Sequence, residues 1–270
     1  PGPSALPALL PPPRPAGARL PAHQRLPSPD HVSEALAEAE LLELLARAEL
    51  EVEGRFVDSS NATLLVSVRG DGLELRGVYK SEAGERPLWD FDGGLWRREV
   101  AAYELDRLLA LGQVPPTVAR EDGPAGRGSL QLYREPDNGE HYLTLVEGDD
   151  FYEAFQRLAA FDVIANNADR KSGHVFCSEG EVVAIDHGLC FHEELKLRTV
   201  IWEFAGQPIH DAIAEATTRI ASGEIGKVAE FISPAEQGAL ISRAAELLEV
   251  GTLPEPEERD GWPPYPWPLI

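Results

Sequence analysis

Two aspartates separated by a short, fixed length of chain constrain this fold most tightly. Asp169 lies in a polar stretch directly after an apolar run, and Asp186 follows a second apolar run 17 residues later. That spacing has room for one β-hairpin, which we predict as strands at 173–177 and 181–185 joined by a turn at 178–180. A hairpin of this kind brings both carboxylates to the same end of a small sheet.

Two carboxylates around one pocket suit phosphoryl transfer. In that reaction one acid orients the attacking hydroxyl, and another holds the metal ion that neutralises the phosphates. We assign the first role to Asp169 and the second to Asp186. The alternative is ordinary turn chemistry, because Asp and Asn side chains bond to nearby backbone and Asp-His-Gly is a common exit from a strand. The spacing of the two acids favours the functional interpretation.

Length and composition limit the architecture. A chain of 270 residues with 43% hydrophobic content can bury one large core or two modest lobes, and we expect two lobes that share a cleft. No run of about 18 apolar residues occurs, so we expect no membrane span. Residues 1–31 hold 10 prolines without the charged and apolar regions of a signal peptide. The only cysteines, Cys177 and Cys190, are compatible with a reducing cytosol, so we expect a cytoplasmic protein.

The charge of the chain limits its partners. A net charge of -22 without a basic cluster argues against binding nucleic acid or an anionic membrane surface. Solubility alone is enough to explain the acidity. Lysine is scarce, because 20 arginines stand against four lysines, namely Lys80, Lys171, Lys196 and Lys227.

Periodicity predicts the elements on either side of the hairpin. The predicted strands of the first part are 50–57, 62–69, 73–80, 114–118 and 128–134, and the predicted helices of the chain are 33–49, 95–111, 151–164, 209–222 and 234–250. We divide the chain into an extended or disordered Pro-rich segment at 1–30, an N-lobe at 31–135, a C-lobe at 136–253 and a tail at 254–270. The tail is rich in Pro and Trp, and we expect it to strap its rings onto a lobe.

Residues suited to a nucleotide lie in the N-lobe. Lys80 ends a predicted strand, and a lysine inside the sheet of an arginine-rich chain suggests a compact charge for phosphate. Glu99, on the next predicted helix, is the acid that we pair with it. Ser60 and Asn61 lie in a turn whose small residues and free N–H groups let an anion approach closely. The structural alternatives are a solvated strand end, an exposed helix carboxylate and an ordinary hairpin turn.

Several motifs, in order, resemble the phosphoinositide 3-/4-kinase family over Val57 to Ala205. Segment 155–170, which ends in Asn-Ala-Asp-Arg, and segment 184–191, which contains Asp-His-Gly, resemble its catalytic and metal-binding loops. The likeness is closest to the type II 4-kinases, and Asn-Ala-Asp is also similar to the HipA-type bacterial protein kinases. In the first lobe, Lys80 matches the family's nucleotide lysine, the turn before it matches the phosphate loop, and the hinge strand corresponds to Gln131, Leu132 and Tyr133.

The resemblance implies an α+β, two-lobed atypical kinase-like fold, with a small antiparallel β-rich N-lobe and a mainly α C-lobe. It also implies an ATP-dependent phosphotransferase that uses Mg or Mn and acts on a protein or small-molecule hydroxyl. We expect Arg170 to pair with an acid and fix the catalytic loop. Where the family has Asn as a second metal ligand, this chain has His174. Imidazole is a softer donor that suits manganese or zinc better than magnesium, so His174 leaves the metal preference open.

Other functions stay open on the sequence. The same fold can transfer AMP instead of phosphate. A third possibility is a nucleotide-binding pseudokinase or scaffold, in which His174 marks a lost metal site. His174 is also compatible with a plain turn or core histidine. We consider a lipid acceptor unfavourable, because a membrane-docking kinase requires a basic or exposed apolar surface.

Overall fold

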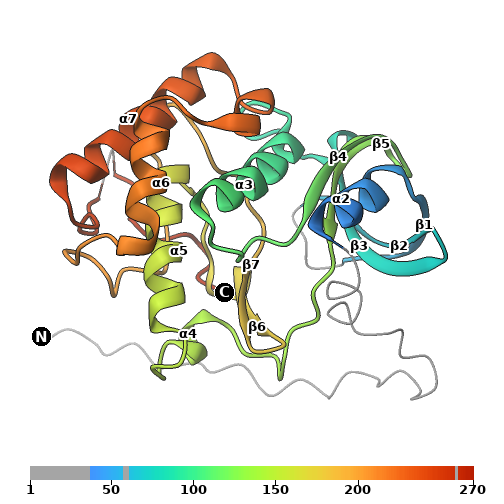
Figure 1. The fold of residues 1–270 in the computed structure, drawn as a ribbon, viewed down its shortest axis with the longest axis horizontal. Helices are drawn as coiled ribbons and strands as arrows, with labels where there is room; N and C mark the ends of the chain where they lie inside the picture. The colour runs from blue at the N-terminus through green and yellow to red at the C-terminus, as the bar shows by residue number, and fades with distance from the viewer. Residues whose placement is uncertain (1–36, 57–60, 259–260) are drawn as a thin grey trace, which may run out of the picture.

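The structure of the chain is a computed structural model that describes residues 37–56, 61–258 and 261–270. The predicted Pro-rich segment, Ser60 and the start of the first predicted helix lie outside the described residues. The described residues form a small lobe with an antiparallel sheet and a larger, mainly helical lobe (Figure 1). The predicted α+β, two-lobed class is confirmed.

A five-stranded antiparallel sheet builds the small lobe. Its strands are β1 (Glu49–Arg55), β2 (Thr63–Gly70), β3 (Leu73–Ser81), β4 (Thr117–Gly123) and β5 (Gly126–Leu132), in the order β1-β2-β3-β5-β4. Along β3, Leu75, Gly77 and Tyr79 are buried and their neighbours are half-buried, as the two-residue period of a strand requires. Tyr79 faces the core beneath helix α2 (Glu38–Arg47), so Lys80 faces the opposite side of the sheet.

The first helix ends earlier than predicted. We expected it to reach residue 49, but it ends at Arg47, and β1 begins at Glu49. Ala48 adopts an extended conformation, and a Cβ on Gly70 of β2 would lie 2.8 Å from Leu44 and 3.3 Å from Ala48. The helix therefore crosses the sheet edge in close contact, and the chain turns back at Ala48 to pair with β2.

The larger lobe is built around buried helices. Its elements are α4 (Tyr142–Leu145), α5 (Tyr152–Ala165), α6 (Asp211–Ala221), α7 (Pro234–Val250), the 3-10 turns η2 (Ser172–His174) and η3 (Gly226–Glu230), and the hairpin β6 (Val175–Ser178) and β7 (Glu181–Ala184). Phe155, Leu158 and Phe161 of α5 are fully buried in its core. Helix α3 (Leu95–Leu109), preceded by the 3-10 turn η1 (Glu82–Gly84), packs against β4 and β5 on one side and against η3 and α5 on the other (Figure 1).

The local sequence explains where α7 begins and ends. Ser233 accepts a hydrogen bond from the N–H of Glu236, whose carboxylate in turn accepts from the N–H of Ser233, and proline occupies the first turn. Gly251 ends the helix in the left-handed region with a φ of 75°. The prediction of a helix at 234–250 is confirmed.

Two predicted strands shift, for different physical reasons. The strand expected at 114–118 begins at Thr117, because Pro115 and Pro116 have no N–H to donate to a sheet. The strand expected at 173–177 begins at Val175, because residues 172–174 form a 3-10 turn first. That turn moves His174 out of the hairpin and to its open end.

No helix among the described residues is both long enough and apolar enough to cross a membrane.

Candidate functional site

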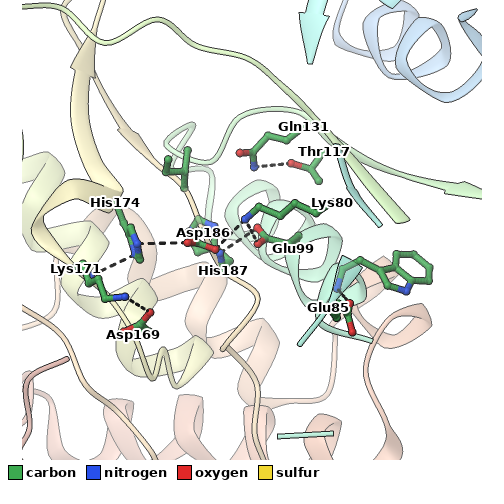
Figure 2. Close-up of polar contacts among 12 residues, drawn as sticks. Lys80, Glu85, Glu99, Thr117, Gln131, Asp169, Lys171, His174, Asp186 and His187 are labelled. Carbon is green, nitrogen blue, oxygen red and sulfur yellow. Dashed lines mark hydrogen bonds and ion pairs between the residues drawn. The ribbon is translucent and has the colours of Figure 1, made fainter. Parts of the chain in front are cut away.

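Three charged residues from three separate elements meet between the lobes. Lys80 of β3 contacts Glu99 of α3, and its Nζ donates to Oδ1 of Asp186 at 2.9 Å (Figure 2). The Glu99 side chain is only 4% exposed, whereas that of Asp186, after β7, is 51% exposed. The structure therefore brings together Lys80, its predicted partner Glu99 and the predicted metal ligand Asp186. Their roles toward a nucleotide stay predictions.

Charge pairing sets the ionisation of this cluster. Burial alone would lower the pKa of the Lys80 ammonium, but the carboxylates of Asp186 and Glu99 outweigh it and raise that pKa. The ammonium in turn holds the pKa of Asp186 well below its usual range. Burial raises the pKa of the Glu99 carboxyl, although Lys80 opposes the rise. Glu99 therefore depends on Lys80 to carry its charge in a dry site.

Removing Lys80 should make stability depend on pH through Glu99. In Lys80→Met the carboxyl keeps its burial and loses its cation, so its pKa in the folded protein rises further above the ordinary 4.5. Stability linked to a raised carboxyl pKa is fully present below pH 4.5 and is lost as pH rises through the folded value. We expect a loss of about 3 kcal/mol at pH 8 that largely disappears near pH 5, measured by urea unfolding.

The matched control carries Lys80→Met together with Glu99→Gln. Glutamine cannot ionise, so the double variant should show the same loss relative to the wild type at both pH values. An equal loss for Lys80→Met at pH 5 and pH 8 would show that an uncompensated Glu99 charge is not the cause.

Asp186 adopts a backbone conformation that costs energy. Its φ is 61°, in the left-handed region that residues other than glycine seldom adopt. The flanking amides hold it there, because Ile185 N–H donates to the carbonyl of His174 and His187 N–H donates to Oε2 of Glu99 at 3.0 Å. Conformations of this kind persist only where the surroundings enforce them, and they concentrate at functional sites. The chain is thus held so that the Asp186 carboxylate points at Lys80.

A second polar pair continues from Asp186 toward the loop that bears Asp169. His174 Nε2 lies 3.4 Å from Oδ2 of Asp186, and Lys171 Nζ lies 2.9 Å from Oδ2 of Asp169 (Figure 2). Burial lowers the pKa of His174 to about 4, so its imidazole is neutral at pH 7. Burial raises the pKa of the Asp169 carboxyl, and Lys171 opposes that rise. Lys171 N–H also donates to His174 Nδ1 at 3.4 Å, so a continuous row of polar contacts runs from Asp169 through Lys171, His174 and Asp186 to Lys80.

The donor set fits a metal ion shared with a ligand. No group of three or more His, Cys, Asp or Glu side chains placed to hold a metal ion occurs in the described part of the chain. Asp186 and His174 offer two donors. Magnesium in phosphoryl-transfer sites typically binds one or two carboxylates, several waters and the substrate phosphates, and it does not need a cage made of protein. The pair therefore suits a divalent ion that arrives with phosphate.

A fully buried ion pair supports the loop that bears Asp169. Asp162 of α5 accepts hydrogen bonds from Arg170 Nε and Nη2, from Asn167 Nδ2 and from Thr199 Oγ1, at 3.0 to 3.2 Å. Arg170 also donates from Nη1 to the carbonyl of Ile185 at 2.9 Å. The expected acid partner of Arg170 is thus Asp162. One guanidinium fixes the loop of Asp169 to the residue that precedes Asp186.

Sequence reasoning missed three residues of this site. His187 is fully buried between Glu99, which accepts its backbone N–H, and Arg170 Nη2, which lies 2.8 Å from its Nε2. Lys171 contacts Asp169 directly, and its rarity in this chain was a usable signal. Asp162, the one charged residue in the apolar second half of α5 at 158–165, was another such signal.

The predicted hinge residues are already engaged in the sheet. Leu132 N–H donates to the carbonyl of Pro116 at 2.8 Å, and Tyr133 N–H donates to that of Arg76 at 3.0 Å. Gln131 Nε2 donates to Oγ1 of Thr117 at 2.9 Å (Figure 2). A nucleotide base would therefore have to meet carbonyls of these residues or groups that follow them in the chain.

The described chain resumes at Asn61, two residues before β2. Asn61 accepts a hydrogen bond through Oδ1 from the N–H of Arg86 at 3.0 Å, and the next amide, of Ala62, donates to the carbonyl of Gly84. These two residues are thus tied to the chain that follows β3. Ser60 lies outside the described residues.

A separate hollow of about 640 Å³ lies along α2 and α3. Its lining includes Glu38, Tyr103, Arg107 and Lys227 and none of the predicted site residues. The charged groups from distant elements converge elsewhere, at the contact of Lys80 with Glu99 and Asp186.

Comparison with known proteins shows the fold and the family. No protein-family model matches the chain. The crystal structure of the Golgi casein kinase with Mn/ADP bound aligns with a TM-score of 0.51 and 13% identity, over 79% of this chain and 75% of that one. The Helicobacter pylori proinflammatory kinase CtkA aligns with a TM-score of 0.47 and 13% identity, over 75% of this chain and 92% of that one. The first likeness shows a kinase-like fold and, at this identity, the fold alone.

A relative with much higher identity is known from sequence. Protein Rv2133c of Mycobacterium tuberculosis (strain ATCC 25618 / H37Rv) is 40% identical over 268 residues, which cover 84% of this chain and 94% of the relative. Identity at this level over nearly the whole relative is shared by descent, so this chain belongs to the protein family of Rv2133c.

Proposed function

We propose that the protein is an ATP-dependent phosphotransferase. The observation that carries this proposal is the contact of Lys80 with both Glu99 and Asp186. Asp186 in turn contacts His174, which follows the loop that bears Asp169. Lys80 binds the nucleotide phosphates, Asp186 with His174 holds a divalent ion, and Asp169 orients the acceptor hydroxyl. Ser60 and Asn61 cover the phosphates, and the strand of Gln131 to Tyr133 borders the base.

Each residue has a physical reason for its role. Glu99 is buried, so it holds the Lys80 ammonium in place without drawing water into the cleft. The divalent ion, when bound, neutralises charge on the phosphates. Asp169 holds the hydroxyl in line with the phosphorus, and burial, which raises the pKa of its carboxyl, makes it a better acceptor for the hydroxyl proton. Lys171, in contact with Asp169, supplies a further positive charge beside the acceptor.

The cofactors follow from the donors and from the structural neighbour. We propose ATP with Mg or Mn, and the imidazole of His174 favours Mn. The Golgi casein kinase structure was determined with Mn/ADP, which supports a nucleotide and a divalent ion for this fold. The finer assignment to the phosphoinositide-kinase type rests on the sequence motifs. The acceptor is a protein or small-molecule hydroxyl.

We also propose that the lobes divide near residue 135, between an N-lobe at 31–135 and a C-lobe at 136–253. The described chain leaves β5 at Leu132 and enters α4 at Tyr142, which supports a boundary in that interval. Both cysteines are free and buried, which supports a reducing, cytoplasmic location.

Thermal denaturation with ATP and different divalent ions tests the nucleotide site before any acceptor is known. We expect ATP with Mn or Mg to raise the Tm of the wild type by about 5 °C at saturation. Asp186→Ala should abolish this metal-dependent shift, and Asp169→Ala should retain it, because only Asp186 is assigned to the metal. Equal loss in both variants would contradict the two roles, and no shift in the wild type would contradict the proposal.

Product mass separates the proposed activity from its two rivals. Phosphate adds far less mass to an acceptor than AMP does, so mass spectrometry distinguishes phosphoryl from nucleotidyl transfer. Nucleotide binding without turnover in either Mg or Mn would identify a pseudokinase.

A further inference from the structure

The last described segment, 261–270, lies against the candidate catalytic loop. Thr199 N–H donates to the carbonyl of Pro264 at 3.1 Å, and Ser172 N–H donates to that of Leu269 at 2.8 Å. Thr199 itself pairs with Arg170 as a parallel bridge, so one strand's width separates the segment from the residue after Asp169. These contacts are made by its backbone, and the Trp262 ring adds a stacking contact with Trp89, as expected of a strap.

Exposed indole rings gather beside this contact. Trp262 of the segment stacks on Trp89, from the loop before α3, with ring centroids 5.9 Å apart and an angle of 25° between the planes. Trp89 is 79% exposed and Trp262 48% exposed, which is unusual for so large an apolar surface. We call these two residues the tryptophan platform.

Arg198 connects the platform to the catalytic aspartate. Its guanidinium lies 5.1 Å from the centroid of the Trp262 ring. Its backbone N–H donates to the carbonyl of Asn167, two residues before Asp169. Burial raises the pKa of the Asp169 carboxyl, and the positive charges of Lys171 and Arg198 oppose that rise. Arg198 therefore links the platform to the loop that bears the group assigned to the acceptor hydroxyl.

The charges beside the platform are balanced. Lys171 contacts Asp169, Arg198 lies 3.8 Å from Asp90, and Lys196 lies 3.9 Å from Asp90 and 3.6 Å from Glu194. Three cations thus face three carboxylates, and the chain as a whole carries a net charge of -22. No surplus of positive charge is left to attract a strongly anionic acceptor.

These features favour one class of acceptor. A stacked, exposed indole surface contacts flat apolar groups, and paired charges hydrogen-bond to hydroxyls. The role assigned to Asp169 requires that the acceptor carry at least one hydroxyl. A sugar or cyclic polyol has an apolar C–H face and a hydroxyl edge on the same ring. An isolated serine side chain offers the hydroxyl but no ring face for the platform.

Building on the proposed phosphotransferase function, we propose that segment 261–270 completes the acceptor site and that the acceptor is a neutral sugar or cyclic polyol stacked on the tryptophan platform. One of its hydroxyl oxygens bonds to the γ-phosphorus of ATP. The bond from that phosphorus to the bridging oxygen breaks, and ADP leaves with the electron pair. The hydroxyl proton passes to the Asp169 carboxylate and then to water.

Ligand-observed saturation-transfer NMR on the full chain tests the binding without ATP. The probes are glucose, galactose, xylose and myo-inositol. We expect at least one to bind, with an affinity about tenfold lower in Trp262→Ala. The matched control is Trp267→Ala, which removes an indole of the same segment that is 87% exposed. Binding by none of the probes, or an equal effect of both substitutions, overturns the inference.

Turnover separates this inference from the proposed function. With ATP and Mn, the bound probe should gain the mass of one phosphate, and Trp262→Ala should lower kcat/KM for it about tenfold without changing ATP affinity. Phosphorylation of a degenerate serine/threonine peptide library but of none of the probes overturns the sugar acceptor and leaves the phosphotransferase intact. Probe binding without metal-dependent ATP binding overturns the phosphotransferase, and with it this acceptor role.

Discussion

Asp162→Ala is expected to lower the free energy of unfolding by about 3–5 kcal/mol, the typical result of removing one partner from a buried ion pair. Both side chains of the pair, Asp162 and Arg170, have no exposed surface. The substitution leaves a guanidinium that cannot lose its proton and cannot reach water. It also leaves Asn167 and Thr199 without their shared acceptor. Urea unfolding followed by circular dichroism at pH 7.5 measures the loss.

Two further variants identify the cause of that loss. Glu43→Ala breaks an ion pair with Arg47 in which both side chains are at least 70% exposed, so it should cost less than about 0.5 kcal/mol. Asp162→Leu combined with Arg170→Met removes both buried charges, and it should recover at least half of the loss because no charge is left unpaired. A double variant as unstable as Asp162→Ala would show that the unpaired charge is not responsible.

Local patterns predicted the framework of the fold well. Alternating residues located β2 and β3 to within a residue or two, and the helix at 234–250 was predicted with its observed ends. Such signals are strong because period and capping act within a few residues of chain. One error occurred where a neighbouring element decides the outcome, because Gly70 lets α2 approach and the chain turns at Ala48.

The candidate site was predicted in part, and the division has a physical basis. The spacing of Asp169 and Asp186 around one hairpin is a local property, and the hairpin is present with Val175 paired to Ala184. Contacts between distant segments have no such signature. Nothing in the sequence shows that Arg170 reaches both Asp162 and the carbonyl of Ile185. Bringing Lys80 to Asp186 across 106 residues required the resemblance to a family.

Asp169→Asn should lower the rate of phosphoryl transfer by about 10²–10⁴-fold, the range typical of a positioned group that handles a proton in the transition state. Asparagine keeps the shape of the side chain and an oxygen for Lys171, but it can no longer accept the proton of a hydroxyl through a carboxylate. The backbone N–H of residue 169, which donates to Oδ1 of Asn167 at 3.0 Å, is unaffected, so the loop should keep its conformation. ADP formation under saturating ATP and Mn measures the effect.

The size of the effect on binding decides what the rate change means. Because Asp169 is assigned to the acceptor and not to the metal, the affinity for ATP with Mn should change by less than about twofold, which places the loss in kcat. Asp149→Asn, an exposed acid in the loop before α5, is the matched control and should leave both quantities unchanged. An unchanged rate in Asp169→Asn would remove this residue from the mechanism. A parallel loss of ATP affinity would instead move it to the metal, and the polar row from Lys171 to Lys80 would then serve the nucleotide alone.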